Sequence, residues 1–341
     1  MKPMKTKEPQ SIPARLRDSA AQPDDLSRDY ARSDDPLDDS VQHKPGPTPV
    51  TYLLILMTLL LWASSFPVVR YGLKSASNLG GFSPGALALL RFIIASAGAL
   101  VFLMVTRAGL PRKEDLPRLA IAGLIGIALY HSLFNFGEQQ VASGAAAALV
   151  AFSPVFTALL SMVLIGDRLP LWGWLGVLCS TVGVLIIGFV DVTGFTFNLY
   201  ALALIGSALA TATYFVIAKP LLSHYSGMQF TCYSFIAGTI PLFVFAPALI
   251  GELPTASPQA YASVAYLGLM PALAGYALWN SAMQRMSPAR MAVFLNISPV
   301  FAAVIAWLWL AEIPSSLAII GAIVAIIGVL MVQLTKESTP Y

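Results

Sequence analysis

Charged residues are scarce in this chain. Only 11% of its 341 residues are Asp, Glu, Lys or Arg, whereas 57% are hydrophobic and the mean hydropathy is +0.74. A soluble domain carries about 25% charged residues, so the composition excludes one and places most of the chain in a lipid bilayer. The net charge of +3 is too small and too dispersed to indicate nucleic-acid binding.

Cysteine and the motifs of enzyme chemistry are also rare. The two cysteines, Cys179 and Cys232, lie in apolar runs and show no CxxC spacing, so we interpret them as small packing residues. No nucleophile motif, metal-ligand cluster or phosphate-binding loop accompanies them. These absences argue against an enzyme and predict neither a cofactor nor a metal.

The first 49 residues lack the hydrophobic core of a signal peptide. They hold 8 of the 20 basic and 9 of the 17 acidic residues, mixed with Pro and Ser without periodicity. We therefore expect residues 1–49 to form a disordered cytoplasmic tail. Its acidic stretch, residues 24–39, is either a solvated leader or a binding site for a regulator.

From residue 50 onward the chain supplies ten apolar runs that are long enough to span a bilayer, which takes about 20 residues. The predicted spans are 50–70, 83–106, 117–138, 144–165, 171–190, 199–218, 228–250, 260–284, 289–310 and 316–334. The loops between them are too short for a soluble domain, so function must reside in the helical bundle or at its two faces.

Basic residues in the loops fix the expected orientation. With the N-terminus in the cytoplasm, the outer segments contain Arg70 and Lys74. The inner segments contain nine basic residues, namely Arg107, Arg112, Lys113, Arg118, Arg168, Lys219, Arg285, Arg290 and Lys336. This positive-inside bias predicts a multi-pass protein of the inner membrane with both termini in the cytoplasm.

The sequence repeats itself 145 residues apart. The stretch 133–185 reappears without a gap as 278–330, including the SPVF motif at 153–156 and again at 298–301. Each copy holds five spans, an odd number, so the second must enter the membrane from the opposite side. We expect two inverted five-helix repeats, residues 50–190 and 191–335, followed by a short cytoplasmic tail at 336–341.

Two prolines fall at corresponding points of these repeats, near the middle of the fourth and ninth predicted spans. Pro154 and Pro299 each remove one intrahelical hydrogen bond and free a carbonyl group. Kinked or interrupted helices at matching points of inverted halves indicate a substrate cavity near the bilayer midplane. A kink that serves only packing is the alternative.

Polar residues share one face of the third predicted span. His131, Asn135 and Glu138 stand at positions i, i+4 and i+7. The repeat maps these positions onto Tyr276, Asn280 and Met283. Because a buried amide in lipid needs a partner, we expect the two asparagines to face each other across the pseudo-two-fold axis, in the bundle interior or a wet cavity. Hydrogen bonding between helices is the alternative.

Aromatic side chains gather in the same spans, where they could wall a pocket for a small amphipathic solute. With the polar groups, they give the candidate substrate-binding residues Trp62, Ser65, Arg91, Tyr130, His131, Asn135, Tyr214, Tyr276, Trp279 and Asn280.

Two ionisable residues of this set have open roles. Arg91 lies too deep in the second span to be a loop charge, so it pairs with a substrate carboxylate or an inner carbonyl, or it snorkels to a helix end. His131 is the side chain placed to titrate inside the bundle, which leaves proton coupling open, although a neutral, hydrogen-bonded histidine is the commoner case.

Several stretches resemble the drug/metabolite transporter superfamily of the EamA type. They are LLLWASSFPVVR at 59–70, LRFIIASAGAL at 90–100, and the run through the first SPVF with its echo FLNISPVFAAVIAWLWLAEI at 294–313. The resemblance covers residues 50–335. It implies ten transmembrane helices in two inverted halves around a central cavity, with kinked fourth and ninth helices.

The resemblance also assigns an acidic residue after each SPVF helix, Asp167 and Glu312, which we expect to cap the next helix rather than touch substrate. Four-helix multidrug relatives carry a proton-coupling glutamate in the first span. This chain has Trp62, Ala63, Ser64 and Ser65 there, which weakens the case for carboxylate-driven antiport.

Taken together, these features predict an all-α membrane transporter that exports small amphipathic metabolites, amino acids being the first guess, by alternating access. Its expected partners are the small-molecule substrate and membrane lipid. Two alternatives are a membrane-embedded enzyme with His131 and Glu138 as an acid/base pair and a sensor whose tail recruits partners. Coupling ion, direction and the choice between monomer and homodimer stay open.

Overall fold

The computed structural model describes residues 47–73, 80–141, 143–189, 199–301, 304 and 316–335. Nearly all of the predicted tail 1–49, the stretch 191–198 after the first repeat and the predicted tail 336–341 lie outside these residues. So do Glu312 and most of the second half of the ninth predicted span. Residues 45–341 group into one compact unit.

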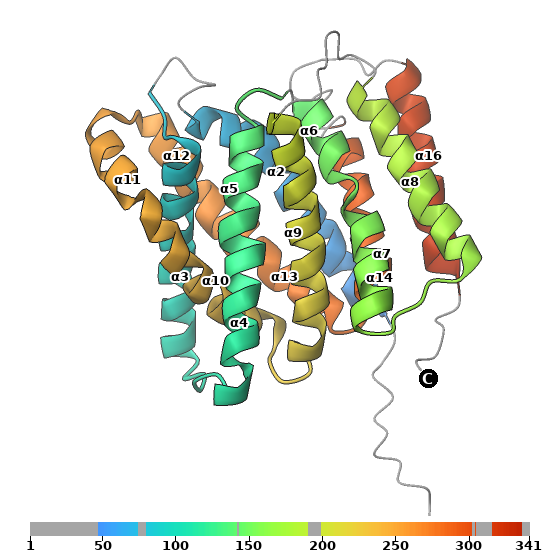
Figure 1. Ribbon diagram of the computed structural model, residues 1–341, viewed down its shortest axis with the longest axis horizontal. Helices are drawn as coiled ribbons and strands as arrows, with labels where there is room; N and C mark the ends of the chain where they lie inside the picture. Colours follow the sequence, from blue (N-terminus) through green and yellow to red (C-terminus); the bar gives the residue numbers. More distant parts are fainter. Residues whose placement is uncertain are drawn as a thin grey trace, which may run out of the picture. The chain divides into compact units, whose positions relative to one another are not determined.

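Helices account for nearly all of the described chain (Figure 1). The first predicted repeat contains α2 (Pro49–Gly72), α3 (Pro84–Val105), η2 (Lys113–Asp115), α4 (Leu116–Gly123), η3 (Leu124–Leu129), α5 (Tyr130–Gly137), α6 (Ser143–Val150), α7 (Ser153–Leu164) and α8 (Leu171–Phe189). The second contains α9 (Leu199–Leu221), α10 (Gly227–Leu242), η4 (Phe243–Phe245), α11 (Ala246–Glu252), η5 (Leu253–Thr255), α12 (Pro258–Leu267), η6 (Gly268–Ala274), α13 (Gly275–Met283), α14 (Pro288–Ala292), η7 (Val293–Ile297) and α16 (Ser316–Leu334). Within the described ranges, β pairing is limited to an isolated bridge between Leu73 and Phe82.

Within the described residues, seven helical stretches are long and apolar enough to cross a membrane. They are Pro84–Val105, Lys113–Gly137, Ala146–Leu164, Leu199–Leu221, Gly227–Thr255, Pro258–Met283 and Ser316–Leu334. Two shorter apolar helices, Pro49–Ser65 and Leu171–Ile187, overlap the first and fifth predicted spans. Many large hydrophobic side chains on the outside of the bundle are exposed, as expected for a surface whose solvent is lipid. The chain is therefore a multi-pass helical membrane protein.

The SPVF motif begins a new helical segment in each predicted repeat. The helix α6 ends at Val150, and α7 starts at Ser153 with Pro154 in its first turn. In the second copy, the 3₁₀ segment η7 ends at Ile297 and Ser298 resumes a helix. Proline suits the first turn of a helix because its missing N–H would have no partner there. The prolines thus come directly after helix breaks and do not kink continuous helices.

A second irregularity also occurs at matching places. The third span widens into a π-helix at η3, directly before Tyr130 and His131, and the eighth span does so at η6, directly before Gly275 and Tyr276. Short π-helical segments often accompany functional sites, because they shift the next side chains of the helix around its axis. Both segments place an aromatic residue next to the cavity that is the candidate site.

The helices α8 and α16 lie side by side at one edge of the bundle (Figure 1). Added to Gly176, a Cβ atom would lie 2.7 Å from the carbonyl oxygen of Gly328, and one added to Gly321 would lie 2.7 Å from that of Gly183. These contacts show that the two helices run antiparallel with their backbones close together. Small residues allow such an approach in membranes.

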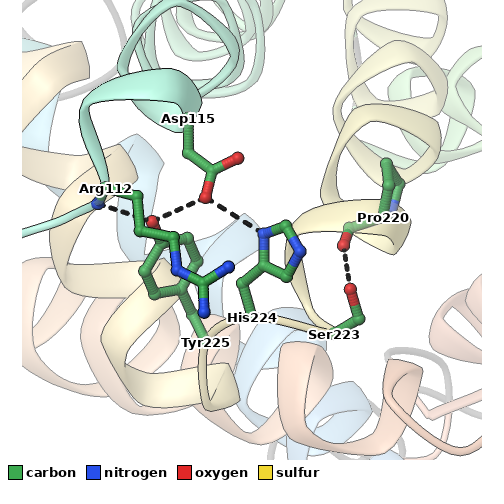
Figure 2. A network of polar contacts seen from close by, with 6 residues as sticks. All are labelled: Arg112, Asp115, Pro220, Ser223, His224 and Tyr225. Carbon is green, nitrogen blue, oxygen red and sulfur yellow. Dashed lines mark hydrogen bonds and ion pairs between the residues drawn. The ribbon is translucent and has the colours of Figure 1, made fainter.

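Loops of the two predicted repeats meet at the end of the bundle where α4 begins, which we call the α4 end. The hydroxyl of Tyr225 donates to Asp115 Oδ2 at 2.8 Å and accepts from the backbone N–H of Arg112 at 2.9 Å (Figure 2). His224 Nδ1 lies 3.0 Å from the same carboxylate oxygen. Burial raises the pKa of Tyr225, so its hydroxyl stays protonated and acts as the donor.

Both ends of the described helical chain also lie at the α4 end. Lys219, in the last turn of α9, donates to two carbonyl oxygens at and just after the end of α13, each at 2.7 Å. Arg285 Nη1 donates to Thr48 Oγ1 at 2.9 Å, next to the start of α2. Arg290 Nη2 donates to Thr335 Oγ1 at 3.3 Å, next to the end of α16. Basic residues thus collect where the helical chain starts and finishes.

At the opposite end, which we call the α11 end, a second contact joins the two repeats. The backbone N–H and the hydroxyl of Ser83 both donate to Glu252 Oε2, at 2.8 and 3.2 Å. The backbone N–H of Ser257 donates to the carbonyl of Gly80 at 3.0 Å. Gly80 has a φ of +78°, and a Cβ atom there would lie 2.8 Å from the carbonyl oxygen of Thr255. Only glycine suits that position.

Candidate functional site

A cavity of about 90 Å³ lies among helices of both predicted repeats. One water needs roughly 10–15 Å³ on this measure, so the space suits a small solute. Its walls are formed by α2, α3, η3, α5 and α6 with α9, α13, η7 and the residues just after η7. The lining residues are Trp62, Ser65, Arg91, Gly126, Tyr130, His131, Phe134, Ala147, Val150, Ala151, Thr211, Tyr214, Phe215, Tyr276, Leu295, Ser298 and Pro299.

The structure brings most of the predicted site residues to this cavity. Seven of the ten candidate substrate-binding residues line it, namely Trp62, Ser65, Arg91, Tyr130, His131, Tyr214 and Tyr276. Pro299 lines it as well, whereas Pro154 is buried outside the lining set. The two residues of the predicted acid/base pair are also placed differently: His131 lines the cavity and Glu138 does not.

Aromatic rings hold one another in place along one wall. Trp62 and Tyr276 pack edge to face with centroids 5.3 Å apart, and Tyr214 packs edge to face on Tyr276 at 5.7 Å. The indole N–H of Trp62 donates to the carbonyl of Pro271 at 2.8 Å. That carbonyl lies inside the π-helical segment η6. The irregular helix therefore orients a cavity side chain on the other repeat.

The polar side of the cavity centres on His131 and Tyr276. The hydroxyl of Tyr276 lies 3.3 Å from His131 Nε2, within hydrogen-bonding distance. The imidazole is also packed between the rings of Phe92 and Tyr130, with centroids 4.6 Å away in each case. Only 3% of His131 is exposed. The ring is thus fixed in orientation with one nitrogen directed across the interface between repeats.

Arg91 brings a full positive charge to the cavity wall. It lies midway along α3 with 3% of its surface exposed, and its guanidinium carbon is 5.7 Å from the centre of the Phe92 ring. Its Nε atom is enclosed and has no hydrogen-bond partner among the described residues. No Asp or Glu is among the described residues that line the cavity. Within the part of the chain that the structure describes, the charge therefore faces a space without a carboxylate.

Three predicted site residues lie outside the cavity lining. Asn135 donates to the carbonyl of Pro84 at 3.1 Å, and Asn280 donates to Tyr214 at 3.0 Å and to Thr231 at 2.9 Å. Trp279 is fully buried, against Trp62 among other side chains. The asparagines thus join α5 to α3 and α13 to α10 and do not meet each other. This placement matches the alternative of hydrogen bonding between helices.

Sequence reasoning missed other lining residues, among them Thr211, Ser298 and Gly126. Ser298 belongs to the repeated SPVF motif, which could have pointed to it. Gly126 is needed because a Cβ atom there would overlap the ring of Tyr214. No periodic pattern in the sequence identifies such a contact between helices that are 88 residues apart.

Metal ligation finds no support in the described part of the chain, where no three His, Cys, Asp or Glu side chains gather closely enough. Both Cys179 and Cys232 are free thiols. The cavity offers hydroxyl, imidazole, guanidinium and aromatic groups instead. Such groups are suited to binding and orienting an organic solute.

A helical membrane bundle with an amphipathic cavity at the meeting of two repeats has the architecture of a membrane transporter. The sequence model described as the EamA-like transporter family matches residues 49–189 and 198–334, almost the whole helical part. The chain belongs to this family, in agreement with the resemblance found in its sequence.

Known relatives are similar along most of their length. An uncharacterized transporter of Bacillus subtilis (strain 168), YdfC, is 35% identical over 79% of this chain and 86% of its own. A probable terminal-alkyne amino-acid exporter of Streptantibioticus cattleyicolor is 34% identical over 82% of this chain and 92% of its own. One crystal structure aligns with a TM-score of 0.66 at 18% identity, covering 83% of this chain and 96% of that one. This last likeness concerns the fold alone.

Proposed function

We propose that the protein exports amino acids or closely related small metabolites across the inner membrane. The observation that carries the proposal is the cavity, which combines a guanidinium, an imidazole and hydroxyl groups with aromatic and aliphatic walls. Such a mixture suits a solute that has a charged end and an apolar body. The Streptantibioticus cattleyicolor relative is described as a probable terminal-alkyne amino-acid exporter, which supports the same substrate class.

The transport cycle that we propose is alternating access between two inverted five-helix repeats, with ten spans in total. The antiparallel contact of α8 with α16 supports inversion, because these helices are the last spans of the two repeats. The contacts at the α4 end and the α11 end each join loops of opposite repeats. Breaking the contacts at one end while keeping those at the other would open the cavity to one side of the membrane at a time.

The proposed orientation places the α4 end in the cytoplasm. Thr48 and Thr335 lie at this end, together with the basic residues Lys219, Arg285 and Arg290. A concentration of Lys and Arg on one side is the usual mark of the cytoplasmic face. Both chain termini would then lie in the cytoplasm.

Counterflow in proteoliposomes tests this function. Purified protein is reconstituted into vesicles preloaded with unlabelled leucine, and uptake of external radiolabelled leucine is followed against protein-free vesicles. We expect a transient accumulation that depends on the preload. A second set of vesicles carries the folded Ala151→Phe variant, which fills the cavity and should abolish the accumulation. Wild-type vesicles that accumulate neither leucine nor any other amino acid would refute amino-acid transport.

A further inference from the structure

The strongest unexplained feature of the cavity is the charge on Arg91. The guanidinium is buried in a membrane-spanning helix and makes no ion pair with any described residue. A buried charge without a partner is strongly unfavourable, and guanidinium groups in membranes normally pair with an acid, a carbonyl or water. Arg91 lines the cavity, so a molecule that enters the cavity can supply the missing partner.

We propose that Arg91 binds the carboxylate of the substrate and that the site selects small monocarboxylates with an apolar body. The inference rests on the proposed function and names its substrate class. The planar guanidinium presents N–H donors that match a carboxylate in two parallel hydrogen bonds. The described lining residues include no Asp or Glu, so none of them offers a carboxylate that would compete for these donors.

The rest of the cavity wall determines which part of a solute is recognised. The alkyl side chains of Val150 and Leu295 and the ring of Phe215 provide an apolar surface for an aliphatic body. Among the described lining residues an ammonium group would find neutral hydroxyl and imidazole acceptors and aromatic faces, such as those of Trp62 and Tyr276, but no carboxylate. Such faces attract cations weakly compared with a carboxylate partner. Binding therefore depends on the carboxylate of the solute and little on its amino group.

This specificity is carried by one repeat only. The stretch of the second repeat that corresponds to Arg91, near Ala237, is neutral. The cavity is therefore asymmetric although the fold around it repeats, with its positive charge on the α3 side. A solute with two carboxylates would have one of them placed against a neutral wall, so we expect dicarboxylates to bind poorly.

Four probes of matched shape test the proposal with the purified full-length protein, by isothermal titration calorimetry in detergent. Leucine has both charged groups, 4-methylpentanoate lacks the amine, leucinamide lacks the carboxylate, and 3-methylbutylamine lacks the whole carboxyl group. We expect the two carboxylates to bind within about fivefold of each other, and the two cations at least about tenfold more weakly. Equal affinities for 3-methylbutylamine and 4-methylpentanoate would overturn the proposal. So would a lack of binding by both leucine and 4-methylpentanoate.

Variants of Arg91 provide a second test of the proposal, by the same binding measurement. Arg91→Gln should lower the affinity for 4-methylpentanoate by at least about tenfold. Arg91→Lys should lose less affinity, because it keeps the charge although not the planar geometry. The control variant is Arg107→Gln, at an exposed position two residues after the end of the same helix, and it should bind 4-methylpentanoate as the wild type does. If Arg91→Gln does not fold, the four-probe series on the wild type still decides the question.

The two proposals fail in different ways. If leucine shows no counterflow but 4-methylpentanoate binds in an Arg91-dependent manner, amino-acid export is wrong and the carboxylate site stands. If the folded Arg91→Gln protein transports leucine and binds all four probes as the wild type does, export stands and the carboxylate assignment is wrong.

Discussion

The hydroxyl of Tyr276 and Nε2 of His131 lie 3.3 Å apart, and the two residues occupy the same position in the two sequence repeats, 145 residues apart. Equivalent residues touch only where the axis that relates the repeats passes between them. Cys179 and Val324 are equivalent in the same sense, and the thiol of Cys179 donates to the carbonyl of Val324 at 3.6 Å. The two contacts support a pseudo-two-fold axis, and the first of them places it at the cavity.

Removing the hydroxyl of Tyr276 should slow transport without unfolding the protein. Tyr276→Phe keeps the ring that packs on Trp62 but loses the group that contacts His131. We expect leucine counterflow to fall by about five- to tenfold, in line with the loss of one buried hydrogen bond. Tyr266→Phe is the control, because its hydroxyl bonds Ser64 outside the cavity lining. A Tyr276→Phe rate equal to that of the control would show that this contact has no part in transport.

Mutations at the α4 end and at the α11 end should have opposite effects on access to the cavity. Asp115→Asn weakens the contact of the α4 end with Tyr225, and Glu252→Gln weakens that of the α11 end with Ser83. Each change should favour the state that is open at its own end, because it removes a charge-assisted hydrogen bond between the repeats.

The measurement is the rate at which a membrane-impermeant maleimide labels a Thr211→Cys cavity thiol in oriented vesicles. We expect Asp115→Asn to raise labelling from the α4 side by about threefold or more and to lower it from the other side, with the reverse for Glu252→Gln. Both variants raising labelling from the same side would contradict alternating access.

The close contact of α8 and α16 should tolerate no larger residue. A Cβ atom on Gly183 would overlap the backbone at Ala325, in the facing helix. We expect Gly183→Val to lower the free energy of unfolding by about 2 kcal/mol or more, since overpacking forces the helices apart. Thermal melts in detergent measure the effect, with Gly109→Ala as a control at a glycine that has open space around it. Equal melting temperatures would disprove the contact.

Asn280 should matter for stability and not for ligand affinity. Its amide donates to Tyr214 and Thr231 and lies outside the cavity lining. We expect Asn280→Ala to destabilise the bundle by about 1 kcal/mol, the usual size of a polar contact between membrane helices. Leucine affinity should change less than about twofold. A large loss of leucine affinity at unchanged stability would show that Asn280 belongs to the binding site.

Features that leave a periodic or repeated trace could be predicted from the sequence. Apolar runs indicate the positions of the described spans, and the 145-residue repeat points to both SPVF breaks. Seven predicted residues line the cavity because polar and aromatic side chains in an apolar span seldom lie against lipid.

Other features depend on three-dimensional contacts and leave no such trace. His131 and Asn135 stand one turn apart on α5, yet His131 lines the cavity while Asn135 donates to the carbonyl of Pro84 in α3. A shared helix face therefore does not decide which side chain reaches the cavity. Pairings such as Glu252 with Ser83 join residues 169 positions apart. Such pairings arise from helix packing, and no local pattern encodes which loops will meet.

The most direct test of the account is reversible blockage of the cavity during transport. A Thr211→Cys protein, with Cys179 and Cys232 replaced by alanine, is reconstituted and treated with a bulky methanethiosulfonate reagent before leucine counterflow is measured. We predict that counterflow is lost on modification and returns when a reductant removes the adduct, while the cysteine-free parent is unaffected. Counterflow that continues at the unmodified rate with the thiol fully labelled would show that the solute does not pass through this cavity.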